Sequence, residues 1–296
     1  MFEGIIGNEK IKEELQKAIK KETISHSYMF IGTEGIGKKL IAKEFSKSLL
    51  CLEPEECNNT CKSCKEFESE NHPDFKIIEP DGNSIKIDQI RELQKKLVEK
   101  PIISERKIYI INDADKMTTE AQNCLLKTLE EPPEFAIIIL IGANESAFLS
   151  TIKSRCTIIH FLPIEDKALE RYLKEEKNIT IESNIMLKTC QGSVKKAIDL
   201  SEKKEQYSQI EELLRQIKRL DIIEIIKKAE ILYKEKEEIY NLLDYMNVNL
   251  IYLSSQDYKY TEGVQIVENT KKRLQSNANY DMSIDNMLFQ LEEKLK

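Results

Sequence analysis

The chain has 296 residues with 45 basic and 52 acidic side chains, which gives a formal net charge of −7. At roughly 100–200 residues per domain, this length predicts two or three domains. Hydrophobic residues make up 41% and charged residues 33%, which excludes a disordered chain. Glycine and proline are scarce, which favours helices, and the acidic balance argues against a protein that coats nucleic acid by charge alone.

The sequence carries no sign of export or of a membrane anchor. Residues 1–4 lack the basic segment that precedes the apolar core of a secretory signal. The longest apolar stretch, residues 136–143, is far shorter than the roughly 18 residues of a membrane span. We therefore expect a soluble cytoplasmic protein with reduced thiols and no membrane partner.

Strand-length apolar runs alternate with helical patterns over the first 160 residues. The runs are rich in isoleucine and aromatic residues and hardly alternate with polar ones, which is typical of strands buried on both faces of a parallel sheet. They comprise residues 27–31, 75–78, 107–111, 136–141 and 157–161. Helix-period stripes lie between them, so the sequence predicts a three-layer α/β domain over residues 1–163.

The character of the sequence changes after Pro163. From residue 165 onward we find only amphipathic helical patterns. We expect a small helical domain over residues 164–203, with a glycine turn at 191–193, and an all-helical domain over residues 204–296. The charged run 201–205 is interpreted as a linker, with a solvated helix face as the alternative.

A phosphate-binding loop is predicted directly after the first strand. Gly32, Gly37 and Lys38 fit the Walker A spacing G-x-x-x-x-G-K, and Gly35 adds a glycine inside the loop. Backbone N–H groups of such a loop hold phosphates, and the lysine reaches the β and γ oxygens. The next residue is Lys39 instead of the serine or threonine that binds Mg²⁺, and an ammonium cannot coordinate a cation. A glycine turn that merely opens a helix is the alternative.

The third predicted strand ends at the position of a Walker B motif. Such a strand ends with an aspartate that binds Mg²⁺, followed in many ATPases by a glutamate that polarises water. These positions hold Asn112, a neutral and weaker ligand, and Asp113, which is shorter than glutamate. Because both motifs are altered, we interpret the domain as an ATPase fold that has lost, or nearly lost, hydrolysis. We expect binding of ATP or ADP to be weak or absent.

Four of the seven cysteines fall within fourteen positions and predict a metal site. They are Cys51, Cys57, Cys61 and Cys64. Four thiolates in a reducing compartment form a tetrahedral structural Zn²⁺ site without an open position. Polar residues at 55–56 and 58–59 agree with that interpretation. Unliganded thiols or a redox CxxC pair are the alternatives.

The remaining cysteines and one histidine have simpler interpretations. Cys124, Cys156 and Cys190 stand alone and are expected to be small buried apolar residues. His72 is a substitute ligand for the metal site or, more simply, a surface residue before Pro73.

Several motifs follow one another in an order typical of one family. The loop and the cysteine cluster precede residues 72–75 (His-Pro-Asp-Phe), 125–133 (LLKTLEEPP) and 154–156 (Ser-Arg-Cys). In these residues the chain resembles the delta-prime subunits of bacterial DNA polymerase III clamp loaders, which are AAA+ proteins. The resemblance covers about residues 1–200, and the last 90 residues agree only in being helical. It implies an AAA+ module with a zinc insertion at about residues 51–64, then a helical lid and a helical collar.

The same resemblance implies site residues and partners. Arg155 would act as an arginine finger toward the nucleotide of an adjacent subunit. Lys195 would occupy the sensor-2 position, where an ATPase carries arginine, and Asn144 would lie near sensor 1. The implied partners are the tau/gamma ATPase and the delta subunit in a hetero-pentameric ring. The sliding clamp and primer-template DNA would be reached through the complex.

Other functions share parts of this pattern. A tau/gamma-like ATPase has the same outline, but Lys39, Asn112 and the chain end at Lys296 favour delta-prime. An autonomous AAA+ ATPase, such as a helicase-loader-like protein, would hydrolyse ATP with Mg²⁺ without partners. A metal-stabilised scaffold unrelated to replication does not account for the motifs at 125–133 and 154–156 in this order.

Overall fold

The computed structural model describes residues 1–53, 57–181 and 183–296, and it divides into two compact units. The first unit is Met1–Ala168 and the second is Leu169–Lys296, so the division falls inside helix α7 (Asp166–Glu176). The finer division of the helical part into a lid and a collar remains a prediction.

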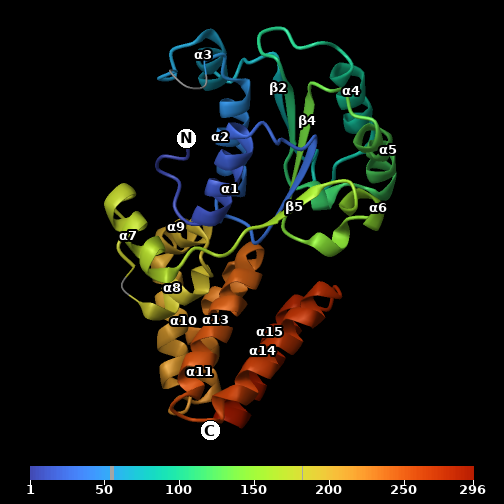
Figure 1. The fold of residues 1–296 in the computed structure, drawn as a ribbon. Coiled ribbons are helices and arrows are strands. Elements are labelled where there is room, and N and C mark those ends of the chain that lie inside the picture. The colour runs from blue at the N-terminus through green and yellow to red at the C-terminus, as the bar shows by residue number, and fades with distance from the viewer. Residues whose placement is uncertain (54–56, 182) are drawn as a thin grey trace. The chain divides into compact units, whose positions relative to one another are not determined.

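A five-stranded parallel sheet of order β2-β3-β4-β1-β5 forms the centre of the first unit (Figure 1). The strands are β1 (Ser27–Ile31), β2 (Phe75–Ile78), β3 (Lys107–Ile111), β4 (Ala136–Gly142) and β5 (Thr157–His160). All five predicted strands are confirmed, with each end within one residue. Every residue of β1, β3 and β4 is buried, as expected for strands covered on both faces.

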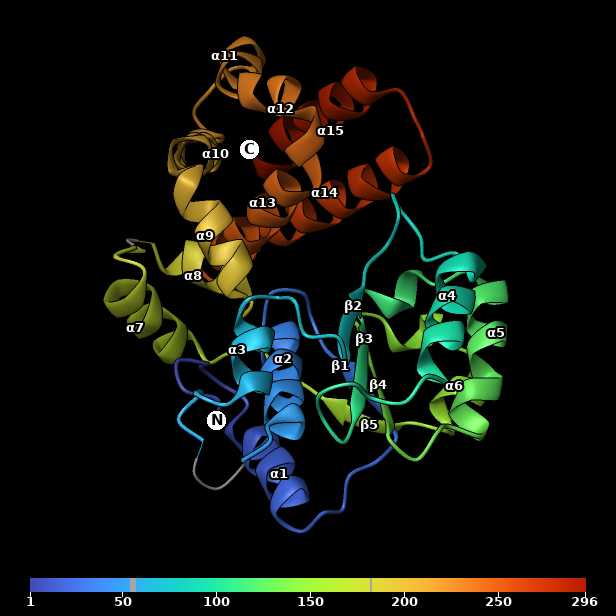
Figure 2. The ribbon, with the colours of Figure 1, turned by 90° about the horizontal axis from the view of Figure 1, so that it is seen from above.

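Helices cover both faces of this sheet (Figures 1 and 2). The helices of the first unit are α1 (Glu9–Lys20), α2 (Lys38–Leu50), α3 (Lys62–Glu68), α4 (Ile87–Leu97), α5 (Thr119–Glu130) and α6 (Ser150–Lys153). Successive strand residues point to opposite faces, so Phe30 packs in one core with Phe45 of α2. Met29 packs in the other core with Leu125 of α5. The predicted three-layer α/β domain is confirmed.

All the regular elements described in the second unit are helices. Its helices after α7 are α8 (Asn184–Cys190), α9 (Val194–Glu202), α10 (Lys204–Gln216), α11 (Ile222–Lys228), α12 (Glu230–Lys234), α13 (Ile239–Ser254), α14 (Tyr260–Gln275) and α15 (Tyr280–Leu295). The long helix α14 packs against α13 and α15. An added Cβ at Gly263 would lie 3.1 Å from Leu250 and 3.3 Å from Leu291, so this glycine permits the close approach.

The structure decides two predictions about the helical part, the turn at 191–193 and the nature of the charged run 201–205. The turn at 191–193 is confirmed, because Gln191 adopts a left-handed conformation (φ +48°) after α8. Of the two interpretations of the charged run 201–205, the helix face is the one observed. Helix α9 continues to Glu202 and α10 begins at Lys204, so only Lys203 separates them. The described helices include no candidate for a membrane-spanning segment.

Candidate functional site

The predicted phosphate loop lies between β1 and α2, and its glycines occupy positions that other residues would not tolerate. Gly35 (φ +79°) and Gly37 (φ +92°) are in left-handed conformations, which glycine adopts without steric cost. A Cβ on Gly32 would lie 2.8 Å from the carbonyl oxygen of Phe161, so glycine is required there as well. The fold therefore explains all three glycines and places the loop at the N-terminus of α2.

The loop lysine is turned toward its own loop. Lys38 is 7% exposed, and its Nζ donates to the carbonyl oxygens of Gly32 at 2.5 Å and Thr33 at 2.6 Å. Burial lowers the pKa of this ammonium, and the nearby carboxylate of Asp115 opposes that shift. A nucleotide phosphate would therefore have to compete with two backbone carbonyls for Lys38.

The residue that replaces the Mg²⁺-binding hydroxyl is engaged in an ion pair. Nζ of Lys39 lies 2.6 Å from Oε1 of Glu79, the residue that follows β2. The first turn of α2 therefore carries the ammonium group of Lys39 where a Walker A loop has a hydroxyl ligand for Mg²⁺.

The two Walker B positions follow β3, as predicted. The N–H of Asn112 donates to the carbonyl oxygen of Ile78 at 2.9 Å. Asp113 is in a left-handed conformation (φ +49°), and its Oδ2 lies 3.0 Å from Nζ of Lys116. The carboxylate at the position of the water-polarising glutamate is thus held in an ion pair by its own segment.

One carboxylate in this region was missed by sequence reasoning. Asp115 accepts the N–H groups of Ala143 at 3.1 Å and Asn144 at 3.0 Å. It thereby ties the end of β4 to the segment after β3. β4 ends at Gly142, and the side chain of Asn144 caps the 3₁₀-helix η2 (Glu145–Ala147). The role of Asn144 near sensor 1 remains a prediction.

The four clustered cysteines lie together in space. Their Sγ atoms are all within 4.8 Å of one another, with Cys51 4.0 Å from Cys61 and Cys57 3.7 Å from Cys64. Four sulfurs at about 2.3 Å from a central Zn²⁺ would be about 3.8 Å apart, so the residues fit a tetrahedral site. A hydrogen bond from the Cys61 backbone lowers the pKa of Cys57 to about 6. Residues 54–56, part of the predicted zinc module, lie outside the described residues.

His72 is buried, so its interpretation as a surface residue is wrong, and both of its ring nitrogens contact protein groups. It is 4% exposed, and its Nε2 lies 2.9 Å from Oγ of Ser63 inside the CxxC segment. Its Nδ1 accepts the N–H of Asp74 at 3.1 Å. Asp74 is fully buried and accepts three backbone N–H groups of residues 102–104. The 72–75 motif therefore joins the cysteine cluster to the segment before β3.

The expectation that all three isolated cysteines are buried holds for only one of them. Cys190 is buried, whereas Cys124 and Cys156 are half-buried because each lies at the edge of the core. Burial raises the pKa of Cys156, the cysteine of the Ser-Arg-Cys motif, to about 11. A raised pKa favours the protonated form of this thiol at neutral pH.

Arg155 lies between α6 and β5 with its backbone fixed and its side chain partly exposed. Its carbonyl oxygen accepts the hydroxyl of the buried Ser27 at 2.6 Å. Its guanidinium donates to the carbonyl oxygen of Thr151 at 2.9 Å and lies 2.7 Å from Glu130. Glu130 belongs to the 125–133 motif, and this contact was not foreseen from the sequence.

The predicted site residues thus fall into separate groups. The phosphate loop, the Walker B positions and the end of β4 gather at the carboxyl edge of the sheet, as ligand sites of parallel sheets do. The cysteines form a second group and Arg155 a third. Lys195 lies in the first turn of α9, in the second unit, and its sensor-2 role remains a prediction.

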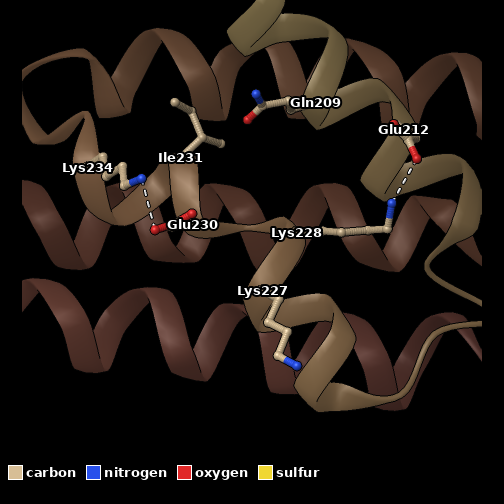
Figure 3. A pocket seen from close by; sticks show the side chains of 7 residues that line it. All are labelled: Gln209, Glu212, Lys227, Lys228, Glu230, Ile231 and Lys234. Carbon is tan, nitrogen blue, oxygen red and sulfur yellow. Dashed lines mark hydrogen bonds and ion pairs between the residues drawn. The ribbon is translucent and has the colours of Figure 1, made fainter.

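A hollow of about 360 Å³ in the second unit does not resemble a catalytic site (Figure 3). It is lined by Gln209, Glu212, Lys227, Lys228, Glu230, Ile231 and Lys234. Lys228 pairs with Glu212 at 2.7 Å and Lys234 with Glu230 at 2.9 Å, so most of its charge is neutralised within the wall.

The family described as DNA polymerase III, delta subunit, matches residues 7–165. The chain is also 34% identical to DNA polymerase III subunit delta' of Bacillus subtilis, over 94% of each chain. It belongs to the delta' family of DNA polymerase III subunits. A delta' subunit of Pseudomonas aeruginosa is 36% identical over 45% of this chain and 42% of that protein.

Relatives of the tau/gamma type also match this delta' family member, and it covers a smaller share of their length. DNA polymerase III subunit tau of Bacillus subtilis is 37% identical over 57% of this chain and 30% of that protein. Among solved structures, a DNA polymerase III gamma subunit-related protein from Thermotoga maritima shares the fold, with a TM-score of 0.53 at 20% identity. That match covers 95% of this chain and 99% of the other. The predicted AAA+ fold class is thereby confirmed.

Proposed function

We propose that this chain is a largely non-hydrolysing subunit of the replicative clamp loader, which loads the sliding clamp on primer-template DNA. It would assemble with the tau/gamma ATPase and the delta subunit into a hetero-pentameric ring. In that ring it would supply Arg155 to the active site of a neighbouring ATPase subunit. The cytoplasm is the expected location.

The observation that carries this proposal is the state of the chain's own nucleotide site. Lys38 is bonded to loop carbonyls, Lys39 is paired with Glu79, and Asp113 is paired with Lys116. The side chains at the loop lysine, at the Mg²⁺-binding positions and at the water-polarising position are therefore replaced or engaged elsewhere. This arrangement favours a subunit whose role does not depend on its own hydrolysis.

Arg155 gives such a subunit a catalytic role in trans. Its guanidinium is partly exposed and its backbone is anchored through the hydroxyl of Ser27. A guanidinium beside a γ-phosphate neutralises the charge that develops in the transition state, and such fingers in GTPases contribute about 10³–10⁵-fold in rate. Lysine is a poor substitute because the planar fork pairs with phosphate oxygens in a fixed geometry.

The cysteine cluster would hold a structural Zn²⁺. Cys51, Cys57, Cys61 and Cys64 would supply four thiolates and leave no position for a substrate. The Zn²⁺ would stabilise the segment around α3, because the affinity of such a site for metal is coupled to folding. The site would not take part in ATP chemistry.

An autonomous ATPase, or a tau/gamma-like ATPase, is the competing function. The test has two parts, both with the full chain. Mixed with separately purified tau/gamma and delta, the chain should elute as one complex of defined stoichiometry. Alone, with Mg²⁺ and ATP, it should show hydrolysis near background. Failure to form the complex, or appreciable turnover by the isolated chain, would contradict the proposal.

A further inference from the structure

Glu130 and Arg155 bring together two motifs that are separate in the sequence. Glu130 is the last residue of α5, inside the 125–133 motif, and Arg155 is the middle residue of the 154–156 motif. Nη2 of Arg155 lies 2.7 Å from Oε1 of Glu130. The hydrogen bonds of helix α5 do not depend on the Glu130 carboxylate. Its contact with Arg155 therefore needs a separate explanation.

The other side of the guanidinium is held by a different element. Nη1 of Arg155 donates to the carbonyl oxygen of Thr151 at 2.9 Å and contacts Oγ of Ser154 at 3.3 Å. With Nη1 fixed on α6 and Nη2 fixed at Glu130, the plane of the guanidinium is defined by contacts on both sides. Arginine has many rotamers, so two anchors restrict it far more than one does.

These contacts leave part of the guanidinium available to a ligand. A guanidinium has five N–H donors, and the Nε–H of Arg155 has no partner among the described residues. The arginine side chain is 33% exposed and the glutamate side chain 50% exposed. A phosphate oxygen can therefore approach Arg155 while Glu130 stays in place.

We propose that Glu130 is a positioning residue that holds Arg155 in the orientation needed to reach the phosphate of an adjacent subunit. This inference rests on the proposed function of Arg155. An exposed ion pair contributes little to folding, so the effect of Glu130 should appear in the reaction rather than in stability. Misplacement of a reacting group by about 1 Å can cost 10²-fold in rate, which sets the upper range of the expected effect.

The test is a double-mutant cycle in the reconstituted loader with tau/gamma and delta. The variants are Glu130→Ala, Arg155→Ala and the double variant, with Glu131→Ala as the matched control because Glu131 is the exposed neighbouring carboxylate. Size exclusion confirms assembly, and the rate of clamp loading and the kcat and KM for ATP are measured for each complex. Glu130→Ala should lower the loading rate and kcat severalfold to about 10-fold with little change in KM. Glu130→Gln keeps a side-chain oxygen that can accept a hydrogen bond from Arg155, so its loading rate and kcat should fall less.

The decisive comparison is the effect of Glu130→Ala in the Arg155→Ala background. If Glu130 acts through Arg155, the double variant should equal Arg155→Ala, and Glu131→Ala should equal the unmodified complex. Unchanged or faster loading by Glu130→Ala, or an equal loss in both backgrounds, would overturn the role of Glu130 while leaving that of Arg155. An assembled complex that is unaffected by Arg155→Ala would overturn the finger assignment and the role of Glu130 with it.

Discussion

Lys39 and Glu79 form an ion pair, with Nζ 2.6 Å from Oε1, that joins the first turn of α2 to the end of β2. Lys39 stands where a complete Walker A loop carries the hydroxyl ligand of Mg²⁺. An ammonium in this position repels a divalent cation instead of binding it. The same site has Asn112 in place of the second Mg²⁺ ligand, so two independent changes act against metal binding.

Replacing Lys39 with threonine should not restore ATP hydrolysis. The hydroxyl would return, but Asn112 would still leave Mg²⁺ under-coordinated and Asp113 would remain short and paired with Lys116. Because the Lys39–Glu79 pair is largely exposed, its loss should change the free energy of unfolding by less than about 1 kcal/mol. Steady-state ATPase assays with Mg²⁺ and thermal unfolding check the two expectations.

Lys43→Thr is a matched control for this variant. Lys43 lies one turn further along α2 and pairs with Glu70 at 3.1 Å, away from the loop. Both variants should have similar stability and background ATPase. Robust hydrolysis by the Lys39→Thr protein alone would show that the segment after β3 had been misinterpreted.

The cysteine cluster predicts a zinc content near one per chain. Cys61→Ser or Cys64→Ser should bring it close to zero and lower Tm by on the order of 10 °C, because loss of a structural metal removes several kcal/mol of folding free energy. Cys124→Ser, a half-buried thiol outside the cluster, is the control and should retain the metal. Elemental analysis that finds no zinc in protein purified without a chelator would refute the site.

His72 predicts a specific dependence of stability on pH. Burial lowers the pKa of this imidazole below its usual value of 6.5, with Asp74 opposing the shift. Protonation of Nδ1 would break its bond with the N–H of Asp74. The stability that neutral His72 contributes is therefore fully present above pH 6.5. It is lost as the pH falls toward the lowered pKa of His72 in the folded state.

The measurement compares the free energy of unfolding of His72→Gln and of the unmodified protein between pH 5 and 8. Below about pH 6.5 the unmodified protein should lose stability faster, by up to about 1.4 kcal/mol per pH unit. The exposed His160, which pairs with Glu145, provides a control through His160→Gln. Parallel curves for His72→Gln and the unmodified protein would rule out this role of His72.

The strands and the phosphate loop could be predicted because their signals are local. A strand buried on both faces is an uninterrupted apolar run, and a glycine-rich turn before a helix has a fixed spacing. The charged run 201–205 had two interpretations because its signal is not specific. Charged residues are common both in linkers and on exposed helix faces, so composition alone did not distinguish them.

The side chains missed by sequence reasoning have partners that are distant in sequence. Asp115 binds backbone N–H groups at the end of β4, and Glu130 binds Arg155 across two elements. His72 appeared exposed because it precedes a proline in a polar segment, yet it is buried beside Ser63. Such contacts depend on which loops the sheet brings together, and residue type and spacing carry no signal for them.

The most direct test of the account is the activity of a complete loader that carries Arg155→Ala. The complex should assemble normally, because the guanidinium contacts are exposed and contribute little to stability. Pre-steady-state measurement of ATP hydrolysis should show that the phase from the adjacent ATPase site is slowed by a factor on the order of 10³, with clamp loading reduced and Arg155→Lys giving little rescue. Unchanged hydrolysis and loading kinetics in an intact complex would contradict the account.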